Sequence, residues 1–280
     1  MTRRAASPAP PDGVLSLRSA RVKAARQLAK RAFRDRGRSF VAEGPQAVRE
    51  ALRRPGIVTE LFVTGQGRAR HADVVGLAAA AGIAVYDVGA EVMSELAQTI
   101  TPQGVVAVCR FVDVPLAAAL ASAPRLVAVL VSVRDPGNAG TVLRTADAAG
   151  ADAVIFAAAS VDPYNAKCVR SSAGSLFHLP VVAGAALADV ITGLRGAGLQ
   201  VLAADGSARL VLDGTPGPDL TRPTAWLFGN EAWGLPASLL ELADAAVAVP
   251  IYGQAESLNL AAAAAVCLYA SARHGRNREP

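Results

Sequence analysis

The chain has 280 residues, of which 52% are hydrophobic, 5% aromatic and 18% charged. The apolar share excludes an intrinsically disordered chain, and the few aromatic side chains exclude an RNA-binding surface built on a large aromatic platform. Residues 1–54 contain 14 Lys and Arg against four acidic residues, whereas the rest of the chain is slightly acidic. This asymmetry favours a polyanionic partner, nucleic acid first, although a solvated helical face explains the same charges.

The cysteines and the apolar runs indicate whether the chain is a metal-binding, membrane or secreted protein. Cys109, Cys168 and Cys267 lie far apart, and no Cys/His pair has metal-ligand spacing, so we expect reduced core thiols and no bound metal. The longest apolar runs are too short to span a bilayer, and the first 14 residues lack the apolar stretch of a signal peptide. We therefore expect a cytoplasmic protein without a membrane partner.

The first half of the chain is predicted to form a small α/β domain over residues 14–112, behind an Ala/Pro-rich tail, residues 1–13, that we expect to be disordered. A basic helix is predicted over Leu15–Phe33, ended by Arg36-Gly37-Arg38. Strands are predicted at residues 39–42, 60–64, 83–88 and 105–111, and helices at residues 45–54, 72–81 and 91–97. Residues 113–124, rich in Ala and Pro, are expected to be a linker.

The second half, residues 125–275, is predicted to be an α/β domain with a mainly parallel sheet, followed by a short tail, residues 276–280. Leu126–Val133 is an apolar run, interrupted only at Ser132, and is typical of a parallel strand covered on both faces. Further strands are predicted at residues 153–156, 179–182, 200–204, 225–228 and 246–250. A helix ending at Gly150 and a final helix over Asn259–Arg273 complete the pattern.

Polar segments follow several of these strands, where ligands bind in open α/β sheets. In Asp135–Gly140, Asn138 can donate or accept, and Gly140 is expected to let a ligand approach the backbone. Arg144 is expected in the first helical turn after it, where an Arg suits a phosphate or hydroxyl ligand; a surface Arg is the alternative. The second segment is Gly229–Leu235, which follows an apolar run. Its Glu231 therefore needs a partner or a function, unless it belongs to a helix cap.

Two more segments are less specific. In Pro250–Leu260, Ser257 is explained as the N-cap of the final helix, whereas Asn259 is a poor helix former and is not explained so easily. In Asp162–Gly174, Lys167 and Arg170 lie three residues apart on one helix face, which fits two phosphate contacts or a solvated face.

A further glycine pair imitates a nucleotide-binding motif. Gly65-Gln66-Gly67 follows a predicted strand, and Asp87 stands 20 residues later, as in a dinucleotide-binding fingerprint. Arg70 occupies the third glycine position, and we therefore set this interpretation aside.

The first three segments together resemble the three motifs of the SpoU family of RNA 2′-O-methyltransferases, in the family's order, at Asp135–Arg144, Leu227–Leu235 and Val249–Ala265. Val161–Pro180 is similar to the family's intervening stretch. Ala42-Glu43-Gly44 and Thr101–Val105 resemble its N-terminal substrate-binding domain. The resemblance covers about residues 15–272.

This resemblance implies a C-terminal SPOUT α/β trefoil-knot domain with a mainly parallel sheet, preceded by a small ribosomal-protein-like α/β domain that binds RNA. It also implies a homodimer with active sites at the subunit interface, and S-adenosyl-L-methionine bound in the knot. The implied cofactor-binding residues are Leu227, Gly229, Asn230, Val249, Ile251 and Leu258. The implied catalytic residues are Arg144, Asn138, Glu231, Ser257 and Asn259.

The basic segments supply the expected RNA contacts, which are Arg18, Arg26, Arg34, Lys167 and Arg170. A separate RNA-binding domain favours large-subunit ribosomal RNA over tRNA as the substrate. Three alternatives stay open: a tRNA 2′-O-methyltransferase, an RNA-binding or assembly factor without catalysis, and a methyltransferase that acts on a base or a protein.

Overall fold

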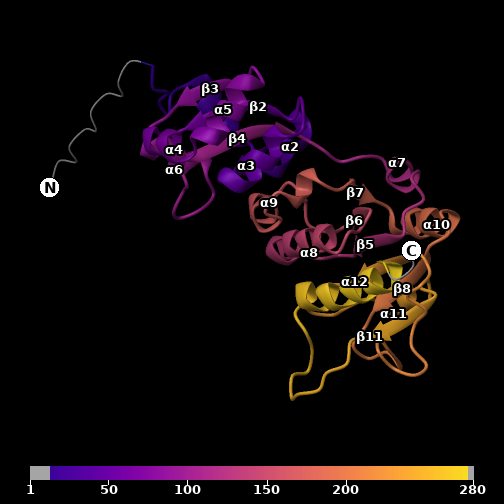
Figure 1. Ribbon diagram of the computed structural model, residues 1–280. Helices are drawn as coiled ribbons and strands as arrows, with labels where there is room; N and C mark the ends of the chain where they lie inside the picture. The colour runs from indigo at the N-terminus through magenta and orange to yellow at the C-terminus, as the bar shows by residue number, and fades with distance from the viewer. Residues whose placement is uncertain (1–12, 277–280) are drawn as a thin grey trace. The chain divides into compact units, whose positions relative to one another are not determined.

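The computed structural model describes residues 13–276, so the predicted tails lie almost wholly outside the described residues. The chain forms two compact units, Met1–Phe111 and Val112–Pro280 (Figure 1). No helix among residues 13–276 is long and apolar enough to cross a membrane. The three cysteines are free and buried, as expected of core thiols, and burial raises the pKa of the Cys267 thiol to about 12.

The first unit is built on a four-stranded sheet in the order β1-β4-β2-β3. Strands β2 and β3 pair in parallel, and β4 pairs antiparallel with β1 and β2. The strands are β1 (Ser39–Glu43), β2 (Val58–Val63), β3 (Ala84–Asp87) and β4 (Val105–Arg110). The helices are α1 (Ala20–Gln27), α2 (Arg31–Gly37), α3 (Pro45–Leu52), α4 (Gly65–Arg70), α5 (Ala72–Ala80) and α6 (Ala90–Leu96). A core that includes Phe62, Met93 and Val106 holds the sheet against α1 and α6.

The basic helix predicted over Leu15–Phe33 is two helices, because the chain turns between α1 and α2. Arg34 holds this turn: its guanidinium donates to the carbonyl oxygens of Leu28 and Ala29, both at 2.9 Å, and the residue is only 4% exposed. A buried guanidinium that already donates hydrogen bonds to helix-end carbonyls is not available to bind a phosphate. The burial of Arg34 and its two hydrogen bonds therefore argue against the predicted RNA contact.

The second unit contains a seven-stranded sheet in the order β7-β6-β5-β10-β8-β11-β9, with each neighbouring pair of strands parallel. This confirms the predicted parallel α/β class. The strands are β5 (Leu126–Leu130), β6 (Ala153–Ala157), β7 (Val181–Ala185), β8 (Gln200–Ala204), β9 (Leu210–Val211), β10 (Thr224–Phe228) and β11 (Ala245–Ala248). Strand β10 lies between β5 and β8, although it follows both in the chain.

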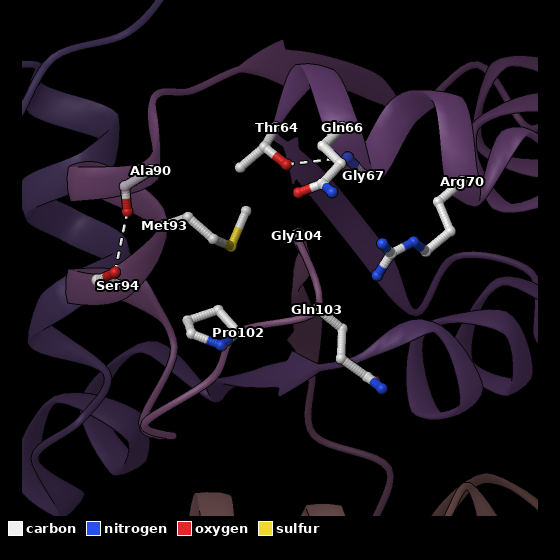
Figure 2. Close-up of a pocket in the computed structure, with 10 residues that line it drawn as sticks. All are labelled: Thr64, Gln66, Gly67, Arg70, Ala90, Met93, Ser94, Pro102, Gln103 and Gly104. Atoms are coloured by element: carbon white, nitrogen blue, oxygen red, sulfur yellow. Dashed lines mark hydrogen bonds between the residues drawn. The ribbon is translucent and has the colours of Figure 1, made fainter.

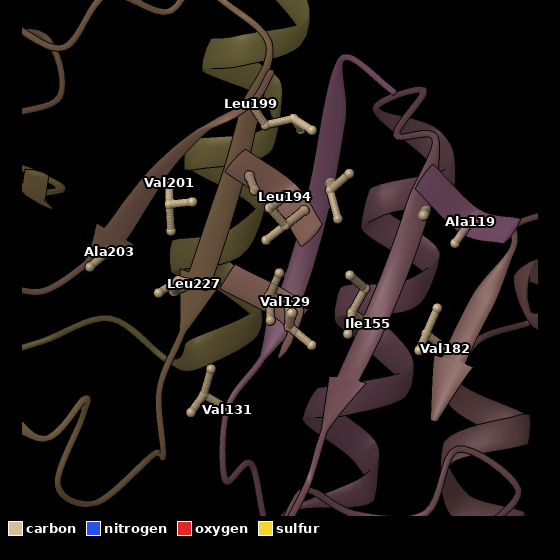
Figure 3. Close-up of a cluster of buried hydrophobic side chains, with 14 of the residues drawn as sticks. Ala119, Val129, Val131, Ile155, Val182, Leu194, Leu199, Val201, Ala203 and Leu227 are labelled. Atoms are coloured by element: carbon tan, nitrogen blue, oxygen red, sulfur yellow. The ribbon is translucent and has the colours of Figure 1, made fainter. Parts of the chain in front are cut away.

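Helices cover both faces of this sheet. They are α7 (Leu116–Leu120), α8 (Pro136–Ala148), α9 (Ala166–Ser171), α10 (Leu187–Gly196), α11 (Ala237–Leu240) and α12 (Leu260–Arg276). On one face α7 and α10 pack against strand residues such as Val129, Ile155 and Leu227 (Figure 3). On the other face the Trp226 indole N–H donates to the Ser271 hydroxyl of α12 (2.9 Å). Two covered faces explain the uninterrupted apolar strands.

The segment expected to be a linker is part of the second unit. It forms α7, and Ala119 of this helix is buried in the core. The buried Tyr164 fixes the start of the segment, because its hydroxyl accepts from the amides of Val112 (2.8 Å) and Asp113 (2.7 Å) and donates to the Asp113 carboxylate (2.6 Å). Burial and the Asp113 carboxylate raise the pKa of Tyr164. The Ala-rich sequence that was expected to be a linker thus forms a short helix packed on the second unit.

Candidate active site

Three polar loops of the second unit follow β5, β10 and β11, and they comprise residues 131–135, 229–236 and 249–259. The carboxyl ends of parallel strands share one edge of a sheet, which is where ligands bind in open α/β folds. The first three predicted segments therefore come together in the folded unit. Hydrogen bonds between their side chains tie the loops to one another, as follows.

Asp135 caps α8 and begins the first loop-to-helix junction. Its carboxylate accepts hydrogen bonds from the backbone amide of Asn138 (2.8 Å) and from the Lys167 ammonium (2.7 Å). The hydrogen bond from Lys167, followed by that from Asn138, lowers the pKa of the Asp135 carboxyl. A Cβ on Gly137 would lie 2.8 Å from both the Asp135 carboxylate and the Lys167 side chain, so a glycine leaves room for this ion pair.

Glu231 joins the second loop to the first. Its carboxylate accepts from the backbone amides of Arg134 (3.3 Å) and Asp135 (3.2 Å) and from the Asn138 side-chain amide (3.2 Å). Partial burial would raise the pKa of the Glu231 carboxyl, but hydrogen bonds from its own backbone amide, from Asn138 and from the two loop amides outweigh it and lower the pKa. The sequence required a partner or a function for Glu231, and the structure supplies the partners.

Asn138 also joins the third loop, since its side-chain oxygen accepts from the Asn259 amide group (3.1 Å). Asn259 is itself the cap of α12, because its Oδ1 accepts from the Ala261 amide (2.9 Å). The expectation that Ser257 caps this helix is therefore wrong. Ser257 is exposed at the rim of the site and makes no hydrogen bond within the described residues.

Asn230 holds the shape of the second loop and is 6% exposed. Its backbone exchanges two hydrogen bonds with Gly234 (3.0 and 2.9 Å), and its side chain donates to the Ser132 carbonyl (2.8 Å). Gly229 precedes this turn, and a Cβ there would lie 2.5 Å from the Gly234 carbonyl carbon. The folded-back loop that presents Glu231 therefore requires glycine at position 229.

Arg144 lies two turns into α8, not in its first turn as expected, because the helix already begins at Pro136. Its side chain is exposed and forms no hydrogen bond or ion pair within the described residues. The expected role of Gly140 is also corrected, since a Cβ on Gly140 would collide with Ser171 and with the Cys168 carbonyl of α9. Gly140 therefore allows α8 and α9 to pack closely, and the Arg144 guanidinium has no partner within the described residues.

An open pocket of about 450 Å³ is formed by the ends of β8, β10 and β11 and the start of α12. Five of the six residues predicted for the cofactor line it, namely Gly229, Asn230, Val249, Ile251 and Leu258. The sixth, Leu227, is fully buried in the sheet core and faces away from the pocket lining, so its side chain is a packing residue. Glu231, Ser257 and Asn259 line the same pocket.

Known proteins match the chain along nearly its whole length. A family model described as the SpoU rRNA Methylase family matches residues 125–269, and an MRM3-like substrate binding domain matches residues 19–107. The chain belongs to the SpoU rRNA methylase family. The 23S rRNA (guanosine(2553)-2′-O)-methyltransferase RlmP of Bacillus subtilis is 38% identical over 256 residues, which cover 91% of this chain and 96% of that relative.

Solved structures of methyltransferases agree with this chain in fold. An AdoMet-bound rRNA methyltransferase from Sinorhizobium meliloti has a TM-score of 0.80 at 35% identity, covering 93% of this chain and 97% of that chain. The SpoU methyltransferase AviRb from Streptomyces viridochromogenes, in complex with AdoMet, has a TM-score of 0.79 at 29% identity, covering 92% and 100%. These matches confirm the predicted family, the SPOUT α/β fold class, an RNA methyltransferase activity and S-adenosyl-L-methionine as the cofactor.

The pocket of this SpoU chain suits a cationic ligand. Its charged lining residues are Asp205, Glu231 and Glu256, and the described residues that line it include no Lys or Arg. Negative charge attracts a sulfonium and an ammonium group and repels a phosphate. Ile251 and Leu258, 37% and 39% exposed, add apolar surface for a base. The residues present therefore fit S-adenosyl-L-methionine.

Asp205 and the adjacent Gly206 were missed from the sequence. They follow β8, whose end was predicted correctly at residue 204, and both line the pocket. The rule that ligands bind beyond the carboxyl ends of parallel strands could have found them. No group of three or more His, Cys, Asp or Glu within residues 13–276 is arranged to hold a metal.

The other predicted RNA contacts of the SpoU chain are at the surface of their own units. Arg18 is exposed, and Arg26 is exposed but pairs with Glu95 (2.6 Å). In the second unit Lys167 is paired with Asp135, while Arg170 is half-buried and has an interaction of its own. Arg18 and Arg144 are thus the predicted cations that a phosphate can reach without breaking an ion pair.

Proposed function

We propose that this SpoU protein transfers the methyl group of S-adenosyl-L-methionine to a ribose 2′-hydroxyl of 23S ribosomal RNA, as a homodimer in the cytoplasm. The proposal rests on the hydrogen-bonded chain Glu231–Asn138–Asn259, which joins three loops beside an acidic pocket. The choice of 23S rRNA is supported by RlmP, whose name specifies that RNA and which matches 91% of the chain.

Bound S-adenosyl-L-methionine supplies an electrophilic methyl group for an in-line displacement. Gly229, Asn230, Val249, Ile251 and Leu258 would hold it through the loops that line the pocket. The carboxylates of Asp205 and Glu256 would balance its positive charge. Asn230 keeps the loop folded through its bond to Ser132, so the cavity is shaped before the cofactor binds.

Arg144 is assigned to the RNA side of the reaction. A guanidinium carries five N–H donors and no acceptor, so Arg144 donates hydrogen bonds and does not act as a base. In this proposal it holds the phosphate beside the target ribose and polarises the 2′-hydroxyl, while a phosphate oxygen or a water molecule takes the proton. Asn138, Glu231, Ser257 and Asn259 form the polar shell that orients the hydroxyl.

The homodimer is supported by exposed apolar side chains on α12 and the loop before it. Tyr252 is 86% exposed, Val266 42% and Tyr269 47%, and they line an open hollow of about 850 Å³. Large apolar side chains gathered in this way mark an interaction surface. Leu258 lines both this hollow and the acidic pocket, so a second copy seated here would border the cofactor.

The test is methyl transfer from radiolabelled S-adenosyl-L-methionine to purified 23S rRNA, 16S rRNA and tRNA, followed by nuclease digestion and mass spectrometry. The expected product is a 2′-O-methylated nucleoside from 23S rRNA. A product from tRNA alone would make this a tRNA enzyme, and a methylated base would change the reaction class. Cofactor binding without transfer to any RNA would support the assembly factor.

A further inference from the structure

A second pocket, of about 140 Å³, lies wholly within the first unit, between α4, α6 and the segment that leads into β4 (Figure 2). Two segments singled out in the sequence form it. One is Gly65-Gln66-Gly67, set aside as a false nucleotide-binding motif, and the other is Thr101–Val105, which resembles the substrate-binding domain. The proposed methyl-transfer chemistry uses neither segment.

The floor of this pocket is two backbone segments in direct contact. The Thr64 amide donates to the Gly104 carbonyl (3.0 Å), and the Thr64 hydroxyl accepts from the Gly67 amide (2.9 Å). A Cβ on Gly67 would collide with the Gly104 carbonyl, and a Cβ on Gly104 would lie 2.6 Å from the Thr64 hydroxyl. Glycine at both positions therefore gives a fixed, closely packed floor.

The walls combine apolar and polar groups. The side chain of Met93, 2% exposed, comes in from α6, and Arg70 approaches from the opposite side of the pocket (Figure 2). The side chains of Arg70, Gln66 and Gln103 are exposed and form no hydrogen bond or ion pair within residues 13–276. A thioether makes favourable contacts with aromatic rings, a guanidinium stacks on bases, and amides pair with base edges.

Size and charge limit the ligand. The volume equals that of about five water molecules at roughly 30 Å³ each, which holds one planar ring system but not a ribose and a phosphate as well. Residues 13–111 carry 15 Lys and Arg against eight Asp and Glu, so the surface of the unit attracts a polyanion. A polyanion that carries flat hydrogen-bonding rings is a nucleic acid.

We infer that this pocket receives one unstacked nucleobase of the substrate RNA, and the inference rests on the proposed RNA substrate. Single bases that leave the stack are the parts of RNA that proteins read through stacking and base-edge hydrogen bonds. The base would lie between Met93 and Arg70, with Gln66 and Gln103 at its edge. The first unit would thus help to select the nucleotide position at which the RNA binds.

The test uses the full chain, with 23S rRNA transcript as the probe. Gln103→Ala removes an edge contact, and Ser94→Tyr fills the pocket from α6. Gln98→Ala and Ala79→Tyr are the matched controls, because both residues are exposed and neither lines the pocket. The pocket variants should raise the Kd for RNA about tenfold. They should not change its salt dependence or the Kd for S-adenosyl-L-methionine, since no charge is altered.

Chemical probing supplies a second readout. In the wild-type complex, one nucleotide should become more reactive toward sugar-modifying reagents and less reactive toward base-modifying reagents. Ser94→Tyr should abolish both changes. An abasic nucleotide at that position should lower wild-type affinity to that of Ser94→Tyr and should not affect the variant further.

The outcomes separate this inference from the proposed function. If the wild type methylates 23S rRNA but the pocket variants bind it as the controls do, the base pocket is wrong and the function stands. If the wild type methylates only another RNA, the function is wrong, and the same variants measured on that RNA decide the pocket.

Discussion

Asn259 donates a side-chain hydrogen bond to the Asn138 oxygen at 3.1 Å, across 121 residues of sequence. The oxygen of the same Asn259 side chain caps α12 through the Ala261 amide. One residue therefore orders the start of the last helix and orients the side chain that binds Glu231. The two tasks use different atoms, and substitutions can separate them.

Asn259→Asp keeps the capping oxygen and removes the donor to Asn138, whereas Asn259→Ala removes both. We expect each variant to lose about tenfold in methyl-transfer rate, in line with one lost hydrogen bond. Only Asn259→Ala should also lose about 1 kcal/mol of unfolding free energy, the usual cost of a missing cap. Initial rates and urea denaturation measure the two effects. Equal stability of the two variants would contradict the capping role.

The lowered pKa of Glu231 predicts a pH-dependent contribution to stability. A carboxyl with a folded-state pKa below its unfolded value stabilises the fold above about pH 4.3, the ordinary glutamate pKa, and loses this contribution as the pH falls through the folded-state pKa. The wild-type Tm should therefore fall more steeply below pH 4.3 than the Tm of Glu231→Gln. Parallel curves for the two proteins would show that the loop amides do not favour the charged carboxylate.

Arg144→Ala should abolish methyl transfer and leave the Tm and the Kd for S-adenosyl-L-methionine unchanged, because the side chain has no partner within the described residues. Arg144→Lys keeps the charge but not the forked donor, so we expect it to recover only a small part of the rate. Single-turnover rates at saturating RNA make the comparison. Near wild-type turnover by Arg144→Ala would remove this residue from the mechanism.

Charge reversal at Arg18 and Arg26 tests the basic N-terminal segment. If both contact phosphates, Arg18→Glu with Arg26→Glu should weaken RNA binding and flatten the slope of log K against log salt by somewhat under one unit per contact. Cofactor affinity should not change, because its pocket is in the other unit. Arg34 is left unchanged in this variant because it is buried. An unaltered salt slope would assign these charges to a solvated surface.

The strands and the order of the functional loops could be predicted from the sequence because their signals are local. A run such as Leu126–Val131 is apolar without a break only where helices cover both faces of a strand. Polar residues at the end of such a run then mark the ligand-binding edge. The position of β10 between β5 and β8 could not be predicted in this way, since it depends on pairing between distant segments.

Single side chains with two possible tasks were the main source of error. Ser257 and Asn259 are both good caps two positions apart, and the choice between them depends on the contact of Asn259 with Asn138. Arg34 has the pattern of a surface cation, but a turn that the helical periodicity did not reveal draws it inside. The identity of a residue determines which interactions its side chain can make, whereas the tertiary structure determines which partners it meets.

Glu231 binds the first loop through the backbone amides of Arg134 and Asp135. Every amino acid except proline carries such an amide, so the contact places no demand on the side chain at position 134. Evolution can therefore vary that position, where Arg134 lies over the Trp233 ring (5.8 Å), without detaching Glu231. A lineage could adapt the rim of the site to a new RNA by substitutions at residue 134. Proline is the one replacement that would remove the backbone amide at this position, and with it the hydrogen bond to Glu231.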